Sequence, residues 1–172
     1  MFNLSKATIA WYLIALAVIL VDQVSKYLAT ASLEMHTPII FTSFFNFTLM
    51  YNEGAAFSFL SDAGGWQRYL FSGLAGAVSI GLVIWLARIP SYKRWEPIAL
   101  ALVLGGAIGN LYDRVVLGHV VDFIVVHYQD HYWPAFNIAD SAISVGAIML
   151  VIDAFFGKKK SGEMASENLD KQ

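Results

Sequence analysis

The sequence YLFSGLAGAVSIGLVIWLA, residues 69–87, contains no charged side chain and lies between Arg68 and Arg88. An α-helix crosses the hydrocarbon core of a bilayer with about 20 predominantly apolar residues. The stretch has that length, and a charged residue borders it at each end. It therefore predicts a transmembrane helix, and with it a membrane protein.

Three other apolar stretches predict further helices of the same kind. They are Ala7–Val21, Pro97–Tyr112 and Ile138–Ile152, the last of which contains Asp140. Each is shorter than a full span and must extend into flanking residues, several of which are polar. We therefore expect four spans, at about residues 7–28, 69–87, 97–117 and 137–156.

The composition supports a membrane protein and argues against other classes. Of the 172 residues, 58% are hydrophobic and 14% are charged, whereas soluble domains carry about 25% charged residues. A net charge of −2 without a long basic stretch inside the body argues against a nucleic-acid-binding protein. The absence of cysteine excludes disulfides, thiolate zinc sites and cysteine nucleophiles. We expect one integral membrane domain, residues 1–157, and a polar tail, residues 158–172.

The first apolar stretch has an alternative interpretation as a cleavable signal peptide. Lys6, the apolar run and the small residues 29–31 together resemble such a peptide. However, Asp22 and Lys26 lie where a cleavage region normally carries no charge. We therefore favour a helix that is retained in the mature protein.

The distribution of Lys and Arg predicts the orientation in the membrane. With a cytoplasmic N-terminus, Lys26, Arg68 and Arg114 would lie outside and the other Lys and Arg residues inside. By the positive-inside rule, both termini and the polar tail are expected in the cytoplasm. The loops around residues 30–66 and 118–136 would then face outward.

These two outer loops contain patterns that are typical of strands. Apolar and polar residues alternate over 45–51, and 119–128 is rich in β-branched and aromatic residues. Residues 38–41 and 55–60 could pair with the first of these strands. We expect a small sheet at the outer membrane surface.

Polar residues in or beside the spans are candidates for function, because charge inside lipid is costly. Asp22 and Lys26 are four residues apart and therefore share one face of a helix. An ion pair between them could also be purely structural, and this alternative stays open.

A second polar group lies at the outer end of the third span. Asn110, Asp113 and Arg114 are close together on this helix. Neutralisation of Asp113 by an arginine is the simpler interpretation, but Asn110 lies deeper and needs a hydrogen-bond partner. Close helix packing is expected at the glycines just before this group: Gly105, Gly106 and Gly109.

The third polar group combines Asp122 with Asn137 and Asp140. Asn137 as the N-cap and Asp140 three residues later would form a capping box, which is a purely structural role. Asp122 lies in an apolar, strand-like run and has no comparable explanation. Two carboxyls in a poorly hydrated place cannot easily both ionise, so one could act as an acid while the other activates water. Both interpretations of Asp140 stay open.

Other functions fit the sequence less well. It contains neither an HExxH zinc helix nor a GxSxG nucleophile elbow. The spacing of its histidines matches no defined ligand pattern, so no metal site is expected. A carrier or channel would distribute polar residues along the depth of the spans, whereas here they gather at the outer ends.

Five short motifs follow one another along the chain. They are VDQVSK (21–26), YNEGAAFS (51–58), GNLYDR (109–114), VDF (121–123) and FNIADS (136–141). Together they resemble signal peptidase II, a family of bacterial aspartic membrane proteases. The resemblance implies an α-helical membrane bundle of four transmembrane helices with a small extracytoplasmic β-cradle and a short helical arm.

The resemblance also implies a reaction and a site. The substrate would be a prolipoprotein, cleaved in the bacterial inner membrane on the amino side of a diacylglyceryl-modified cysteine, without a metal or other cofactor. Asp122 and Asp140 would be the catalytic dyad, and Asp22 and Lys26 would join the first span to the cradle, with Asp113 as a further structural polar residue. The residues that would bind or support the substrate are Asn52, Gly54, Asn110, Arg114 and Asn137. Membrane lipids are the other expected partners, and the oligomeric state stays open.

Overall fold

The computed structural model of the protein describes residues 5–54 and 66–157. Its helices are α1 (Lys6–Ser32), α2 (Trp66–Arg88), α3 (Trp95–Val116) and α4 (Ile138–Ile152), which continues into a short π-helical segment, Asp153–Gly157. Its strands are β1 (Ile39–Thr42), β2 (Phe45–Asn52), β3 (Val120–Tyr128) and β4 (His131–Tyr132).

All four expected spans are helices that are long and apolar enough to cross a membrane. Their bounds differ from the expected ones by a few residues. The largest difference is in α1, which continues to Ser32, about one turn past the expected end at residue 28. Its start is defined by Ser5, whose side-chain oxygen accepts a hydrogen bond from the backbone N–H of Thr8.

Helix α3 packs against each of the other three helices, and its small residues make this possible. A Cβ on Gly105 would lie 2.6 Å from the Cβ of Val18 in α1. A Cβ on Gly106 would collide with the backbone carbonyl oxygen of Ala139 in α4. The close packing that the sequence predicts at these glycines is therefore confirmed, and both neighbours approach the backbone of α3 directly.

The helices bury one apolar face and expose the other. The buried cluster joins α1, α2 and α3, and its largest members are Trp11, Leu82, Leu86, Leu100 and Leu104. Exposed apolar side chains cover the outward faces of α1, α2 and α4, among them Leu13, Leu20, Ile80, Ile84 and Ile148. Such faces suit lipid rather than water, which agrees with four membrane-spanning helices.

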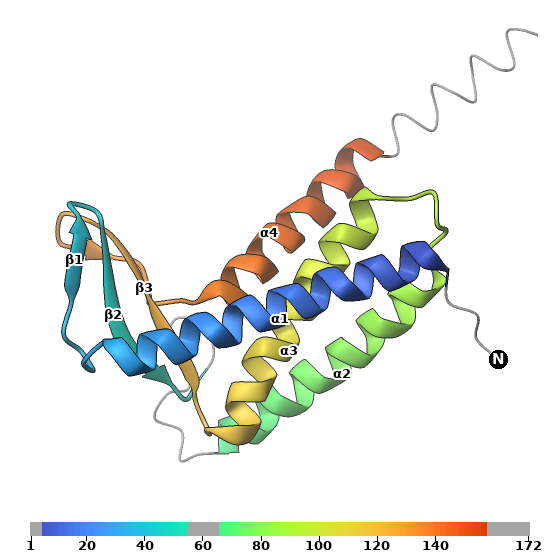
Figure 1. The fold of residues 1–172 in the computed structure, drawn as a ribbon. Helices are drawn as coiled ribbons and strands as arrows, with labels where there is room; N and C mark the ends of the chain where they lie inside the picture. The colour runs from blue at the N-terminus through green and yellow to red at the C-terminus, as the bar shows by residue number, and fades with distance from the viewer. Residues whose placement is uncertain (1–4, 55–65, 158–172) are drawn as a thin grey trace, which may run out of the picture.

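A four-stranded antiparallel sheet lies at one end of the bundle, as Figure 1 shows. The strands follow the order β1-β2-β3-β4, and the expected strands at 38–41, 45–51 and 119–128 are all present with slightly different bounds. The expected pairing of 55–60 lies outside the described residues. The N-terminal end of α1, the connection from α2 to α3 and the C-terminal end of α4 are all at the opposite end (Figure 1).

The register between β2 and β3 contains an irregularity that affects one of the candidate residues. Phe47 pairs with Ile124, but the next pair is Met50 with Asp122, so the two strands are locally out of step. Asp122 is one of the residues of β3 that border this irregularity.

Replacing Gly106 with alanine should destabilise the bundle, because the added Cβ would overlap the backbone of α4. Overpacking of this kind costs about 1–3 kcal/mol. Gly76→Ala in α2 is the matched control, since nothing lies within 4 Å of the position of its Cβ. Thermal unfolding in detergent micelles should show a lower Tm for Gly106→Ala and an unchanged or higher Tm for Gly76→Ala. Equal Tm values would contradict the packing described here.

Candidate active site

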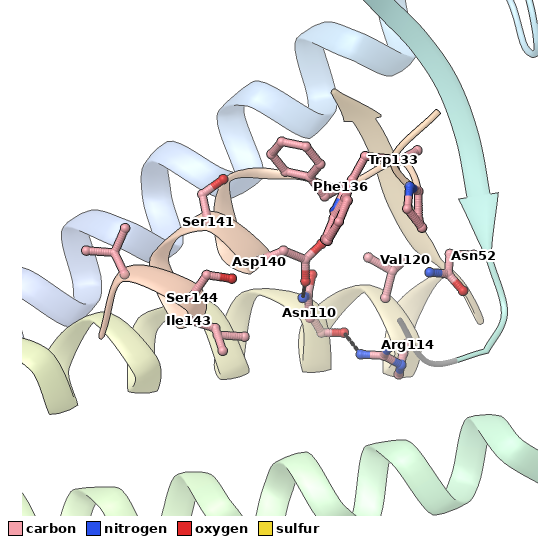
Figure 2. Close-up of a pocket in the computed structure, with 13 residues that line it drawn as sticks. Asn52, Asn110, Arg114, Val120, Trp133, Phe136, Asp140, Ser141, Ile143 and Ser144 are labelled. Atoms are coloured by element: carbon pink, nitrogen blue, oxygen red, sulfur yellow. Dashed lines mark hydrogen bonds between the residues drawn. The ribbon is translucent and has the colours of Figure 1, made fainter. Parts of the chain in front are cut away.

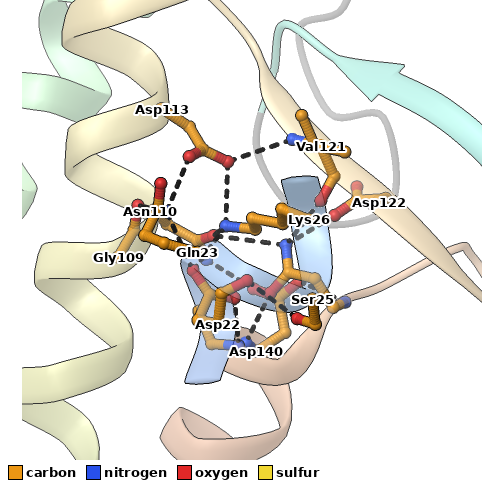
Figure 3. A network of polar contacts seen from close by, with 12 residues as sticks. Asp22, Gln23, Ser25, Lys26, Gly109, Asn110, Asp113, Val121, Asp122 and Asp140 are labelled. Atoms are coloured by element: carbon orange, nitrogen blue, oxygen red, sulfur yellow. Dashed lines mark hydrogen bonds and ion pairs between the residues drawn. The ribbon is translucent and has the colours of Figure 1, made fainter. Parts of the chain in front are cut away.

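A buried ion cluster joins α1 to α3 near the sheet. The Lys26 ammonium lies 2.9 Å from Oδ2 of Asp22 and 2.8 Å from Oδ2 of Asp113, and none of the three side chains is more than 3% exposed. Figure 3 shows these groups converging with side chains from β3 and α4. The ion pair that the spacing of Asp22 and Lys26 predicts is therefore present, and a second carboxylate shares the cation.

The prediction that an arginine neutralises Asp113 is wrong. Asp113 is neutralised by Lys26 of α1 and not by an arginine. The guanidinium of Arg114 instead donates through NH1 to the backbone oxygen of Asn110 and through NH2 to that of Gly54. The physical reason is direction, because adjacent residues of a helix point about 100° apart and cannot share one partner on one side.

The same cluster holds the ends of two other elements. Oδ1 of Asp22 accepts a hydrogen bond of 2.9 Å from the backbone N–H of Ala139, in the first turn of α4. Oδ2 of Asp113 accepts one of 3.2 Å from the backbone N–H of Val121 in β3. The connection from α1 to the sheet thus runs from Lys26 through Asp113, while Asp22 connects α1 to α4.

Gln23 belongs to this cluster, although the sequence analysis did not single it out. Its Nε2 donates to Oδ1 of Asp113 at 2.9 Å, to Oδ2 of Asp22 at 3.1 Å and to the backbone oxygen of Gly109 at 3.2 Å. A signal for it existed, because an uncharged amide between two charged residues of an apolar helix also needs a partner.

Asn110 connects the ion cluster to Asp140. Its Oδ1 accepts from the Lys26 ammonium at 2.9 Å, and its Nδ2 donates to Oδ1 of Asp140 at 2.8 Å. Asn110 was expected to need a hydrogen-bond partner because it lies deep in the span. The structure provides one for its oxygen and one for its NH₂ group. Asp140 is only partly buried and lies beside an open pocket (Figure 2).

The capping box expected at the start of α4 is present as well. Oδ1 of Asn137 accepts from the backbone N–H of Asp140 at 2.9 Å, and Oδ2 of Asp140 accepts from the backbone N–H of Asn137 at 3.3 Å. Asp140 thus caps α4 with one oxygen and binds Asn110 with the other. The structural role and a chemical role are compatible in the same side chain.

Asp122 lies on β3 and is 2% exposed. Its Oδ1 accepts from Nδ2 of Asn137 at 2.7 Å, and its Oδ2 accepts from Nδ2 of Asn52 at 3.1 Å. Burial, and then the neighbouring Asp140 carboxylate, raise the pKa of Asp122 to about 7, although the two amides oppose this increase. Asn137 therefore contacts both candidate carboxyls, and one of them can hold a proton near neutral pH.

The turn after β2 brings two further candidate residues to the same place. Oδ1 of Asn52 accepts from the backbone N–H of Gly54 at 3.0 Å, which closes the turn. The backbone oxygen of Gly54 accepts from NH2 of Arg114 at 3.2 Å. Arg114 thereby ties this turn to α3, and Asn52 is held where it can reach Asp122.

Two adjoining pockets of about 510 Å³ each open beside the carboxyls. The first contains Asp140, Asn110 and Arg114 and extends along α4 to Ile143 and Val145 (Figure 2). The second contains Asp122 and lies against the sheet. The residues common to both are Asn52, Trp133, Pro134 and Ala135. A chain that lies across this boundary would pass both carboxyls.

The arrangement supports acid–base chemistry on water. A protonated carboxyl beside an ionised one can donate a proton to one oxygen while its partner removes a proton from water. In the described parts of the chain, 5–54 and 66–157, no group of three or more His, Asp or Glu side chains is arranged to hold a metal ion. His127 stacks on Tyr132, and the ring of His119 lies against that of Tyr51 at a tilt of 35°.

Comparison with known proteins assigns the chain to a family. The family model described as signal peptidase (SPase) II matches residues 14–156. The lipoprotein signal peptidase of Cellvibrio japonicus is 59% identical over 154 residues, which cover 89% of this chain and 91% of the relative. The lipoprotein signal peptidase of Teredinibacter turnerae is 60% identical over 153 residues, which cover 89% of this chain and 91% of the relative. That of Pseudomonas fluorescens is 56% identical over 161 residues, which cover 92% of this chain and 94% of the relative.

Solved structures agree with this assignment. Two structures described as bacterial membrane enzymes determined by the in meso method are each 32% identical to this chain. The first has a TM-score of 0.77, and the match covers 88% of this chain and 90% of the solved chain. The second has a TM-score of 0.74, and the match covers 86% of this chain and 93% of the solved chain. The chain therefore belongs to the signal peptidase II family of lipoprotein signal peptidases and is an aspartic protease of the membrane.

Proposed function

We propose that this protease cleaves diacylglyceryl-modified prolipoproteins on the amino side of the lipidated cysteine, with Asp122 and Asp140 as its catalytic dyad. The observation that carries the proposal is the position of these two carboxyls. They come from a strand and a helix, both accept a hydrogen bond from Asn137, and each lines one of two adjoining pockets. The remaining candidate residues hold this arrangement in place.

The proposed reaction needs one proton shared by the dyad. The ionised carboxyl removes a proton from water, whose oxygen attacks the scissile carbonyl carbon, while the protonated carboxyl donates its proton to the carbonyl oxygen. The resulting tetrahedral diol then collapses: the carboxyl that took the proton from water gives it to the leaving nitrogen, the C–N bond breaks, and one diol hydroxyl returns its proton to the other carboxyl, which restores the dyad. The pKa of about 7 for Asp122 supports a protonated carboxyl at neutral pH.

The location of the dyad fits a substrate that is anchored in lipid. We infer that residues 1–157 form one integral domain of the bacterial inner membrane, with both termini and the tail (158–172) in the cytoplasm and the sheet outside. The sheet lies at the opposite end of the bundle from the start of α1 and the end of α4 (Figure 1). Exposed Ile40, Phe41 and Phe44, in and beside β1, offer an apolar surface to the membrane. A signal helix in the bilayer would then present its end at the depth of the dyad.

A carrier or channel is the alternative class, and we do not favour it. Such a protein needs polar groups along a path through the membrane. The buried charges of the described helices, Asp22, Lys26 and Asp113, instead gather near the sheet.

Replacement of either proposed catalytic residue with asparagine should abolish most turnover. Asparagine keeps the shape of the side chain and one hydrogen-bond acceptor but cannot exchange a proton. Asp122→Asn and Asp140→Asn should therefore each reduce kcat by about 10²–10⁴-fold. If the two act as one unit, the double variant should be little worse than either single variant. Turnover of a lipidated precursor peptide in micelles measures this.

Asp130→Asn is the control, because Asp130 is an exposed carboxyl in the turn between β3 and β4. Asparagine is also a good helix-capping residue, so a purely structural Asp140 would leave Asp140→Asn active. Substantial activity in a well-folded Asp122→Asn or Asp140→Asn protein would refute the dyad.

Stability should depend on the protonation of Asp122. Its pKa is about 7 in the folded protein and 3.8 ordinarily, so between these values the folded state holds a proton that the unfolded chain has released. Wild-type stability should therefore fall as the pH rises from about 4 to about 7. Asp122→Asn should show a smaller decrease. Thermal unfolding in micelles across this pH range tests the expectation, and parallel curves for the two proteins would contradict the raised pKa.

The lipid on the substrate should matter for turnover. Anchoring at the membrane interface brings the scissile bond to the depth of the dyad, which is a proximity effect. We expect an unlipidated peptide of the same sequence to be cleaved much more slowly than the diacylglyceryl-modified peptide in the same micelles. Equal turnover of the two peptides would argue against recognition of the lipid.

A further inference from the structure

One amide connects the buried cation of the ion cluster to the proposed dyad. Oδ1 of Asn110 accepts from the Lys26 ammonium at 2.9 Å and from Nδ2 of Asn137 at 3.2 Å, while its Nδ2 donates to Asp140 at 2.8 Å. The side chain of Asn110 is 6% exposed and that of Lys26 is 3% exposed. Water therefore has little access to these contacts, which makes their polarity important.

Only one orientation of this amide satisfies its neighbours. A rotation of 180° would turn the Asn110 NH₂ group toward the Lys26 ammonium, which has donors and no acceptor. The same rotation would turn Oδ1 toward the carboxylate of Asp140. All three hydrogen bonds would be lost, and donors would face donors and acceptors would face acceptors. The Lys26 ammonium, which makes the shorter and charged contact with Oδ1, is the stronger of the two groups that determine which end of Asn110 faces Asp140.

Lys26 is itself held firmly. Asp22 and Asp113 bind its ammonium at 2.9 and 2.8 Å, and Gln23 donates to both of these carboxylates. A cation with three fixed oxygen partners has little freedom to move, and its position is transmitted to the amide that it contacts (Figure 3).

We propose that Lys26 is a positioning residue for catalysis, which acts through Asn110 on Asp140. The ammonium keeps the Asn110 NH₂ group directed at Oδ1 of Asp140 throughout the reaction, so that Oδ1 always remains an acceptor. A proton taken up by Asp140 is then carried on Oδ2, whose contact with the backbone N–H of Asn137 is longer, at 3.3 Å. This inference rests on the proposed role of Asp140 in the dyad.

Without Lys26, only the longer contact with Nδ2 of Asn137, at 3.2 Å, would hold the amide oxygen of Asn110, so a protonated Asp140 could compete for it by donating to a rotated amide. The proton would then sit between two protein groups instead of facing the substrate. The effect falls on the chemical step and not on the binding of the substrate, because Lys26 does not line either pocket. We therefore expect kcat to change and KM to stay constant.

The test compares two variants that have the same charge and nearly the same shape. Lys26→Gln and Lys26→Met both remove the ammonium, but glutamine retains an N–H donor for Oδ1 of Asn110 and methionine does not. Each is combined with Asp113→Asn, because this keeps the net charge of the cluster as it is in the wild-type protein. Turnover of a lipidated precursor peptide is measured in micelles.

The glutamine protein should have a kcat about 10²-fold above that of the methionine protein, at similar KM, since small misplacements of a catalytic group have effects of this size. In an Asn110→Ala background the difference between glutamine and methionine should disappear. Lys93→Met, at an exposed lysine between α2 and α3, is the control for loss of a lysine and should match wild type.

Equal kcat values for the two folded proteins would show that Lys26 is merely structural. A difference that persists with Asn110→Ala would show that Lys26 does not act through Asn110. Both outcomes differ from the result that would refute the proposed dyad. That result is substantial activity in Asp122→Asn or Asp140→Asn, whatever residue stands at position 26.

A second measurement is made on the wild-type protein and does not depend on the folding of the Lys26 variants. NMR of wild-type protein labelled with ¹⁵N-asparagine reports the Asn110 NH₂ group, assigned by the loss of its signal in Asn110→Ala. We expect one ¹⁵N signal with a single pair of ¹H signals and slow hydrogen exchange across the whole active pH range. A second pair that interconverts with the first, or fast exchange at the pH where the dyad is protonated, would overturn the proposal.

Discussion

The buried ammonium of Lys26 is the interaction on which the sheet end of this bundle depends. Removal of a charge from water is costly, and the cost is offset here by two carboxylates and an amide oxygen within 2.9 Å. Each carboxylate binds a further backbone N–H, Asp22 that of Ala139 and Asp113 that of Val121. One cation thereby joins α1, α3, α4 and β3. Loss of one partner of a buried pair costs about 3–5 kcal/mol, so these elements depend on one another.

Close helix packing makes this cluster possible. A Cβ on Gly109 would lie 2.6 Å from Oδ2 of Asp22, so any larger residue there would displace the carboxylate that binds Lys26. Gly105 and Gly106 bring α1 and α4 equally close to α3 one turn away. The small residues of α3 thus have a second effect beyond packing, because they let polar groups from three elements meet at hydrogen-bond distance.

Asn137 links the two proposed catalytic carboxyls, which have different environments. Asp140 lies in the first turn of α4, where the helix dipole favours negative charge. Asp122 lies on a strand, almost fully buried, where burial favours the protonated form. Asn137 caps the helix with its oxygen and donates to Asp122 with its nitrogen. The side chain of Asn137 therefore defines the start of α4 and also holds Asp122 of β3 close to that helix.

Local patterns in the sequence are enough to predict the four spans, the strands β1, β2 and β3 and the capping box, because apolar length, alternation and cap spacing act within a few residues. It also indicated which polar residues matter, since charge in an apolar run needs an explanation. The partners of these residues were decided only by the tertiary structure: Asp113 binds Lys26 and not an arginine, and Gln23 binds both carboxylates of the ion cluster. The contacts of Asp113 with Lys26 and Gln23 join residues about 90 positions apart. They depend on how closely the helices approach and on which direction each side chain takes, and no local pattern specifies either.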